Sequence, residues 1–340
     1  MNAASCRASG WHMKRVSDAD LRLLRIFADV VRCKGLSAAQ VELNLSVSSI
    51  SCYIAALEQR LGVRLCNRGR SGFALTEKGE IIYHEAKRLF AVVDEFAMRA
   101  SEVRGRLSGT LRIGHVDCTV SDGNAPMTRA LRRFNSREHD VRVELSIAPP
   151  ADLQRRVLDG QLHLAIACFP ADMSRLETVP LYDEANCFYC SRHHPLFEKD
   201  PVSLDDIHDA RVVARSYWRG ADLLRLGVHR EAASVDIMEA QAMLILSGAY
   251  LGYLPEHYAA PWVAENELRC LLPGELSYVA PFSMISRRGG TPPAIVRQFI
   301  DDLQAVLPEP RTAADGGQRQ RPALALGGMA MAAHSARHHH

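Results

Sequence analysis

The chain has 340 residues, enough for two or three domains with sizeable cores. Its 41 basic and 39 acidic residues leave a net charge of +2, so whole-chain charge indicates no class of partner. No stretch approaches the roughly 20 apolar residues of a membrane span, and the N-terminus lacks the apolar core of a signal peptide. Nine cysteines follow no disulfide-framework spacing. We therefore expect a soluble cytoplasmic protein with reduced thiols and no membrane contact.

Residues 1–16 show no periodic pattern, and we expect a flexible extension there. Residues 17–75 have the pattern of one helical domain. Its first helix carries Asp18 and Asp20 near the N-terminus, where acidic groups are favourable. One face of this helix is apolar and consists of Leu21, Leu24, Ala28 and Val31.

Two helices joined by a tight turn follow, at residues 37–43 and 47–61, and Gly62 supplies the C-terminal stop of the second. The apolar residues of this second helix recur at steps of three and four and share one face: Ile50, Ile54, Leu57 and Leu61. The opposite face is small and uncharged, with Ser48, Cys52, Ala55, Ala56 and Gln59 on it and Tyr53 on its flank. Such a helix can lie deep in a DNA major groove.

Basic residues surround this pair of helices. Between Lys14 and Leu75 ten basic residues outnumber five acidic ones, the modest positive surplus expected of a phosphate-backbone binder. The stretch RGRSGFALT, from Arg68 to Thr76, has glycines for a tight turn and then a short apolar strand, which favours a β-hairpin wing. The plainer alternative is a solvated helix face followed by a solvated loop. The uncharged outer face and the turn spacing favour DNA binding.

The expected DNA contacts are of two kinds. Side chains at the start and on the outer face of the second helix would reach base edges or phosphates: Ser46, Ser48, Ser49, Ser51, Cys52 and Tyr53. Arginines beyond the helix, Arg64, Arg68 and Arg70, would clamp phosphate or enter the minor groove.

A single long helix is predicted over residues 76–104, because proline is absent and Gly79, near the start, is the only glycine. Its apolar residues form a stripe at three-and-four spacing: Ile82, Ala86, Leu89, Val93, Phe96 and Ala100. A stripe of this length must be buried. Self-pairing as a dimer is favoured, and packing against the chain's own domain is the alternative.

Residues 105–109 form a predicted hinge, beyond which strand-like and helix-like patterns alternate. The order TLRIGHV, a helix near 125–135, VRVELSIA, ADLQRRVLDGQ and LHLAIAC predicts βαβαβ units and a mostly parallel sheet.

The expected α/β domain covers 110–308 and has two lobes, the first formed by 110–173 and 277–308, the second by 174–276. Residues 309–340 have no period and are expected to be disordered. They end in three histidines that are either natural or a tag remnant.

The order AAQVELNLSVSSIS, IAALEQRLGVRLCNR and LTEKG resembles the N-terminal domain of LysR-type transcriptional regulators. The likeness continues, more weakly, to about residue 308. The resemblance implies a winged helix-turn-helix, a long dimerising linker helix and a two-lobed, periplasmic-binding-protein-like α/β effector domain. It also implies a regulator that binds promoter or operator DNA as a homodimer or homotetramer, contacts RNA polymerase and responds to a small-molecule effector, often an organic anion.

The outer face of the second helix departs from the usual family pattern. Where relatives commonly carry Gln, Pro, Arg and Gln, this chain has Val47, Ser48, Cys52 and Tyr53. Long polar side chains are missing at these four positions, so we expect few base-specific hydrogen bonds and more reliance on apolar contact and DNA shape.

The resemblance places the effector between the lobes, and ligands of parallel sheets lie at the C-terminal ends of strands. After the first strand of the α/β domain come Asp117, Cys118 and Thr119, where we expect a helix N-terminus to bind a carboxylate through backbone N–H groups. Further candidates follow later strands or precede a helix: Phe169, Arg215, Ser216, Tyr217 and Glu239. For each of them, loop packing is the alternative.

Other classes of function are disfavoured. Cys187 and Cys190, with two histidines close behind, resemble a metal or redox motif, but residues three apart in a strand face opposite sides. No second cluster completes four zinc ligands, and no GxSxG or comparable nucleophile context occurs. We therefore predict no metal, no cofactor and no catalysis. The alternatives are a solute-binding module whose helical N-terminus only dimerises, and an enzyme that uses these two cysteines.

Overall fold

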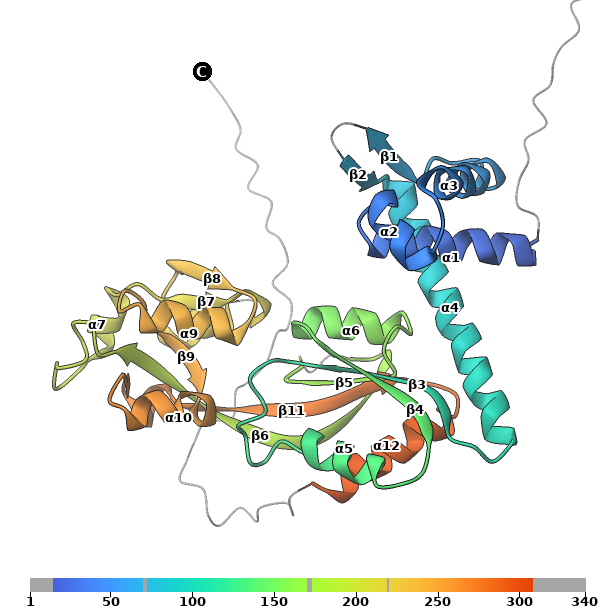
Figure 1. Ribbon diagram of the computed structural model, residues 1–340. Helices are drawn as coiled ribbons and strands as arrows, with labels where there is room; N and C mark the ends of the chain where they lie inside the picture. Colours follow the sequence, from blue (N-terminus) through green and yellow to red (C-terminus); the bar gives the residue numbers. More distant parts are fainter. Residues whose placement is uncertain (1–14, 70–71, 170–172, 219, 308–340) are drawn as a thin grey trace, which may run out of the picture. The chain divides into compact units, whose positions relative to one another are not determined.

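The computed structural model describes residues 15–69, 72–169, 173–218 and 220–307 (Figure 1). The expected C-terminal tail and nearly all of the expected N-terminal extension lie outside these residues. The chain divides into two compact units, one up to Gly109 together with Asp159–Gln161, and one made of the rest from Thr110 onward. None of the helices in the described ranges is long and apolar enough to cross a membrane.

The first unit begins with three helices and a two-stranded hairpin. These are α1 (Asp18–Arg32), α2 (Leu36–Leu43), α3 (Val47–Leu61), β1 (Cys66–Gly69) and β2 (Gly72–Leu75), with the strands antiparallel. The bounds of α3 are those predicted, because Ser46 caps its start and Gly62 adopts the left-handed conformation that ends it. The apolar face of α3 is buried completely at Ile50, Ile54 and Leu57.

The long helix α4 (Glu77–Val103) begins at the cap Thr76 and lies close to the predicted range. Its apolar residues divide into two sets. Ile82, Ala86 and Leu89 pack against the core of the helix-turn-helix domain, so the prediction that the whole stripe faces a partner is wrong for its first half. The reason is that α1 and β2 both pack against α4. Further along, Phe96 is 72% exposed and Val92 is also exposed.

The described residues of the second unit form nine strands. They are β3 (Ser108–His115), β4 (Asp140–Ile147), β5 (Leu164–Ala167), β6 (Leu176–Ser191), β7 (Val213–Arg215), β8 (Ala233–Val235), β9 (Gly252–Pro255), β10 (Leu268–Cys270) and β11 (Tyr278–Arg287). The main sheet has the order β10-β6-β11-β5-β3-β4, with β9 also paired to β6. Because β3 already begins at Ser108, the expected hinge overlaps the first strand of this unit.

The helices of this unit are mostly short. They are α5 (Met127–Asn135), α6 (Pro150–Leu158), α7 (Leu204–His208), the 3-10 helix η1 (Ser216–Trp218), α8 (Ala221–Leu226), α9 (Met238–Leu246), α10 (Glu256–Ala264), α11 (Pro273–Leu276) and α12 (Ala294–Ala305). In Figure 1, α5 and α12 lie together against one face of the β3, β4 and β5 region, and α6 lies on the other. Helices α9 and α10 pack on the part of β6 that pairs with β9.

The expectation of a mostly parallel main sheet is wrong. Strands β3 and β5 pair in parallel as predicted, but β11 runs antiparallel to β5 and β6, and β9 and β10 run antiparallel to β6. The cause is the course of β6 and β11, two long strands that pair with each other in antiparallel fashion and run through both parts of the unit. Figure 1 shows them passing from the region of β3–β5, hereafter the first lobe, to the region of β7–β10, the second lobe. The crossing lies inside both strands, near a register shift between Phe282 and Ser283.

Candidate nucleic-acid interface and effector site

Serine hydroxyls gather at the N-terminus of α3. Ser46 Oγ accepts a hydrogen bond from the Ser49 backbone N–H at 3.1 Å, and it lies 2.9 Å from Ser48 Oγ and 2.8 Å from Ser49 Oγ. Ser46 and Ser48 are exposed. The helix N-terminus carries partial positive charge, so this group of hydroxyls and N–H donors suits a DNA phosphate better than a base edge.

The middle of α3 presents one exposed candidate reader and two that are half-buried. Cys52 is exposed, whereas Ser51 and Tyr53 are partly covered. Tyr53 packs against the domain core, and the guanidinium of Arg22 from α1 lies 5.4 Å from its ring centroid. The ring is therefore held on the flank of α3, where the sequence places it.

The hairpin is attached firmly to α3 and α4. Glu58 Oε1 accepts the Leu65 N–H at 2.7 Å, and Thr76 Oγ1 donates to the Arg64 carbonyl at 2.7 Å. A Cβ on Gly79 would lie 1.8 Å from the Leu65 carbonyl oxygen, so α4 contacts the hairpin backbone directly.

The three expected arginine contacts lie at or beyond this anchored segment. Arg64 is exposed, and its Nε donates to the Cys66 carbonyl at 3.2 Å. Arg68 belongs to β1 but its side chain is not described, and Arg70 lies outside the described residues.

In the second unit, the loop after β3 does not open a helix. Helix α5 begins only at Met127, so the expectation that Cys118 and Thr119 form a helix N-terminal carboxylate site is wrong. Instead Asp117 itself occupies such a position, because its Oδ2 accepts the Met238 N–H at 2.7 Å at the start of α9. Burial and the charge of Asp117 raise the pKa of the Cys118 thiol to about 12.

Thr119 and its neighbour in space, His115, complete this loop. Thr119 Oγ1 lies 3.4 Å from His115 Nδ1. His115 is buried at the end of β3, and burial lowers the pKa of its imidazole below the usual value. This neutral ring gives the loop a polar contact without adding charge.

Arg215, at the end of β7, is buried and already neutralised. Its Nε and one terminal nitrogen bind both carboxylate oxygens of Asp222, at 2.9 and 2.6 Å, and a terminal nitrogen donates to the Tyr278 hydroxyl. The Trp218 ring covers the guanidinium at 4.6 Å. An anionic effector would therefore compete with Asp222 for this arginine.

Of the remaining expected effector residues, Tyr217 lies near Arg215, whereas Ser216, Glu239 and Phe169 have other partners. Ser216 donates to Asp236, and Tyr217 is half-buried, with a pKa raised by burial. Glu239 is exposed and accepts the Tyr258 hydroxyl at 2.6 Å. Phe169 is buried in the core of the first lobe and is held there by packing.

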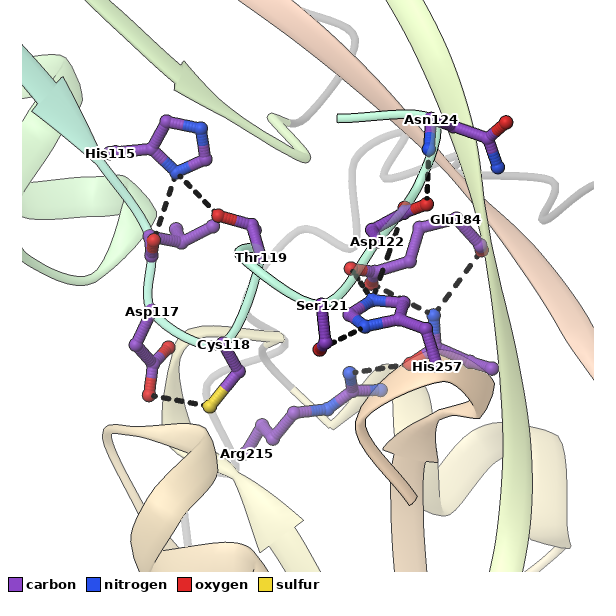
Figure 2. Close-up of polar contacts among 12 residues, drawn as sticks. His115, Asp117, Cys118, Thr119, Ser121, Asp122, Asn124, Glu184, Arg215 and His257 are labelled. Carbon is purple, nitrogen blue, oxygen red and sulfur yellow. Dashed lines mark hydrogen bonds and ion pairs between the residues drawn. The ribbon is translucent and has the colours of Figure 1, made fainter. Parts of the chain in front are cut away.

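Three polar residues that sequence reasoning missed converge between the lobes (Figure 2). They are Asp122 from the loop after β3, Glu184 from the middle of β6 and His257 from the first turn of α10. His257 Nε2 lies 3.1 Å from Glu184 Oε1 and 3.9 Å from Asp122 Oδ2. In the segment LYDEANC, polar Glu184 and Asn186 stand at alternate positions of a strand, on the buried face, and this pattern could have indicated Glu184. No local pattern links Glu184 to Asp122 or His257.

Comparison with known proteins identifies the same two parts. The family model for the bacterial regulatory helix-turn-helix protein of the lysR family matches residues 21–80, and that for the LysR substrate binding domain matches residues 104–308. The HTH-type transcriptional activator BauR of Pseudomonas aeruginosa is 39% identical over 292 residues, covering 84% of this chain and 95% of that protein. The SDS degradation transcriptional activation protein of a Pseudomonas species is 28% identical over 296 residues, covering 80% and 91%.

Solved structures have the same fold. CbnR, a LysR family transcriptional regulator, gives a TM-score of 0.60 at 20% identity, covering 85% of this chain and 99% of that one. Full-length CbnR in complex with its target DNA gives 0.59 at 21% identity, covering 84% and 99%. The chain therefore belongs to the LysR family of transcriptional regulators, with an N-terminal helix-turn-helix and a C-terminal effector-binding domain.

Proposed function

We propose that this regulator binds promoter DNA as a homodimer or homotetramer and activates transcription with RNA polymerase when a small molecule binds between the lobes of its second unit. The observation that carries the proposal is α3, a helix with a fully buried apolar face, a slim exposed face and serine hydroxyls at its N-terminus, fixed to a basic hairpin. Activation is inferred from relatives that are named as activators, among them BauR and the SDS degradation transcriptional activation protein.

The second half of α4 supports self-association. Val92, Phe96 and Val103 are exposed and fall on one helical face at steps of four and seven. Phe96 alone exposes a large aromatic surface that a partner would bury. A second copy of α4 is the partner that the family architecture offers.

The charges between the lobes do not by themselves favour the organic anion that was expected as effector. Arg215 is neutralised by Asp222, and the carboxylates of Asp122 and Glu184 lie in the same group of residues. An anion alone would meet net repulsion there. We retain a small organic effector held near the ends of β3, β5 and β7, and infer that an anionic one needs a positive charge brought to the site.

DNA binding is tested by fluorescence anisotropy with a promoter fragment from upstream of the gene, over a range of salt concentrations. Replacing Arg68 and Arg70 by Ala should weaken binding and reduce the slope of log K against log salt by about 2, one for each lost phosphate contact. Arg132→Ala, which removes an exposed arginine from the second unit, is the matched control and should leave the slope unchanged. Binding without salt dependence, or the same loss in the control, would contradict the proposal.

A further inference from the structure

We propose that Asp122, Glu184 and His257 form a binding site for a divalent metal ion between the lobes. Each offers one ligand atom, and the three ligand atoms lie within 4.8 Å of one another (Figure 2). Asp122 and Glu184 are buried, and His257 is half-buried. The proposal does not depend on DNA binding; only its consequence for transcription rests on the proposed function.

The other polar atom of each side chain is already bound, which leaves one atom of each for the ion. Asp122 Oδ1 accepts the Asn124 N–H at 2.8 Å, and Oδ2 points to the histidine. Glu184 Oε2 accepts from Asn186 Nδ2 at 3.1 Å, and Oε1 points to the histidine. Such outer contacts are what orient carboxylate ligands in metal sites.

His257 has the same arrangement. Its Nδ1 lies 2.8 Å from Ser121 Oγ, and its Nε2 points to both carboxylates. If Nδ1 carries the proton and donates to Ser121, Nε2 is left with a lone pair for a metal. Metal–ligand bonds of about 2.0–2.2 Å place ligand atoms roughly 3–3.5 Å apart. The distance from His257 Nε2 to Glu184 Oε1, 3.1 Å, already fits, and Asp122 Oδ2, at 3.9 Å from the same nitrogen, would have to come closer.

A buried hydroxyl group is a second, independent observation that points to a ligand at this site. Tyr182 is buried, and its hydroxyl has no hydrogen-bond partner among the residues that the structure describes. Tyr182 and Glu184 are two residues apart in a regular part of β6 and so share one face. Burial raises the pKa of the tyrosine, and the charges of Glu184 and Asp122 raise it further. A water bound to the metal would give this hydroxyl its partner.

The ligand set favours a first-row divalent ion. Two carboxylates and one imidazole suit Mn²⁺, Zn²⁺ and similar ions, and three protein ligands leave coordination positions open. The carboxylates carry two negative charges, which a divalent ion balances and a protonated histidine does not. The open positions would also accept an anionic group of the effector. The metal ion would then supply the positive charge that Arg215, already paired with Asp222, cannot supply.

The position of the ligands links the ion to the lobes. Asp122 belongs to the first lobe, His257 to the second, and Glu184 to the strand that runs through both. An ion held by all three favours the arrangement in which the lobes are together, since separation removes a ligand. Metal binding and effector binding therefore act on the same equilibrium.

Mn²⁺ is the best probe, because it prefers oxygen ligands and discriminates against the cysteines and the three terminal histidines. The full chain is treated with EDTA, exchanged into metal-free buffer and titrated with Mn²⁺, with free Mn²⁺ read by electron paramagnetic resonance. We expect one saturable site per chain in the wild type. Glu184→Gln and His257→Gln should each weaken it by more than about 100-fold, beyond the 10–100-fold typical of losing an outer contact.

Asp183→Asn is the matched control. Asp183 is the neighbouring acid on β6, exposed and on the opposite face of the strand, so its loss should not change the Mn²⁺ affinity. Circular dichroism and the unfolding midpoint in EDTA check that all variants fold. Absence of a saturable site in the wild type, or equal weakening in Asp183→Asn and Glu184→Gln, would overturn the proposal and leave a histidine–carboxylate ion pair.

Promoter binding in EDTA separates this result from the proposed function. If the chain binds Mn²⁺ at this site but no promoter DNA, the metal site stands and the regulatory proposal fails. If it binds DNA normally but no Mn²⁺, the metal proposal fails alone.

Discussion

The two candidate sites of this protein are built in opposite ways. The DNA-binding surface comes from one helix and the hairpin that follows it, so residues 46–70 supply all of its expected contacts. The group of residues between the lobes takes its members from positions 122, 184, 215 and 257, which lie in one loop, two strands and one helix. Helical periodicity reveals a site of the first kind. A site of the second kind exists only once the chain has folded, and changes to the two should have separable effects.

The largest expected effect is in the second unit, from Asp222→Ala. Arg215 is buried, and loss of its carboxylate partner leaves an uncompensated charge, which costs about 3–5 kcal/mol in comparable cases. Chemical denaturation should show the second unit unfolding earlier, while the helix-turn-helix keeps its own stability. The double change Arg215→Met with Asp222→Leu, which removes both charges, should restore much of the loss. A mild Asp222→Ala phenotype would show that water reaches Arg215.

The next effect is in the first unit, from Gly79→Ala. The added Cβ would lie 1.8 Å from the Leu65 carbonyl oxygen, so the first turn of α4 must move away from the hairpin. We expect a loss of about 1–3 kcal/mol and weaker promoter binding, since overpacking of this kind displaces backbone. Gly62→Asn is the control, because its site is open and Asn tolerates the left-handed conformation. Equal promoter affinity for Gly79→Ala and wild type would argue against a fixed hairpin.

Acid should weaken the first unit through Asp20. The Arg60 guanidinium is the main cause that lowers the pKa of the buried Asp20 carboxyl to about 2, from 3.8. Because the folded value lies below the unfolded one, the contribution is complete above about pH 4 and is lost as the pH falls toward 2. Asp20→Asn should cost about 1–2 kcal/mol at neutral pH and less in acid. The difference in unfolding midpoint between this variant and wild type, followed from pH 7 to pH 2, measures the effect; a constant difference would contradict it.

The smallest effect is chemical rather than structural. Burial raises the pKa of Cys118 and Cys168 to about 12, so at pH 8 almost none of either thiol is the reactive thiolate, whereas Cys52 is exposed on α3. Iodoacetamide at pH 8 should label Cys52 and spare the other two, as read by peptide mass spectrometry. Labelled protein should bind promoter DNA more weakly, and Cys52→Ser should abolish that response. Labelling of Cys118 at the rate of Cys52 would show that its loop opens to solvent.

The features that could be predicted from the sequence are the local ones, and those that could not depend on residues far apart in the chain. The bounds of α3 and its buried face were predictable, because caps and periodicity are local signals. The apolar stripe of α4 was visible, but its division between the chain's own core and solvent depends on α1, which the pattern of α4 does not contain. The antiparallel course of β6 and β11 was not predictable from alternating elements, since it depends on two strands nearly 100 residues apart.

Site residues in the second unit show the limit most clearly. Asp117 and Arg215 were identified by their places after strands, and both do carry polar contacts there, but their partners are Met238 and Asp222. No local sequence signal distinguishes a carboxylate that binds a ligand from one that caps a helix.

The contact of Asp117 with the start of α9 has one further consequence. It joins the loop after β3 to α9 of the second lobe by a hydrogen bond at 2.7 Å, beside the contact of Ser121 in the same loop with His257 on α10. If the lobes move apart, this bond breaks and the Met238 amide hydrogen becomes open to exchange with solvent. The Met238 amide is thus an intrinsic probe of lobe separation, and its exchange rate, with and without Mn²⁺ or a candidate effector, reads the state of the regulator without any added label.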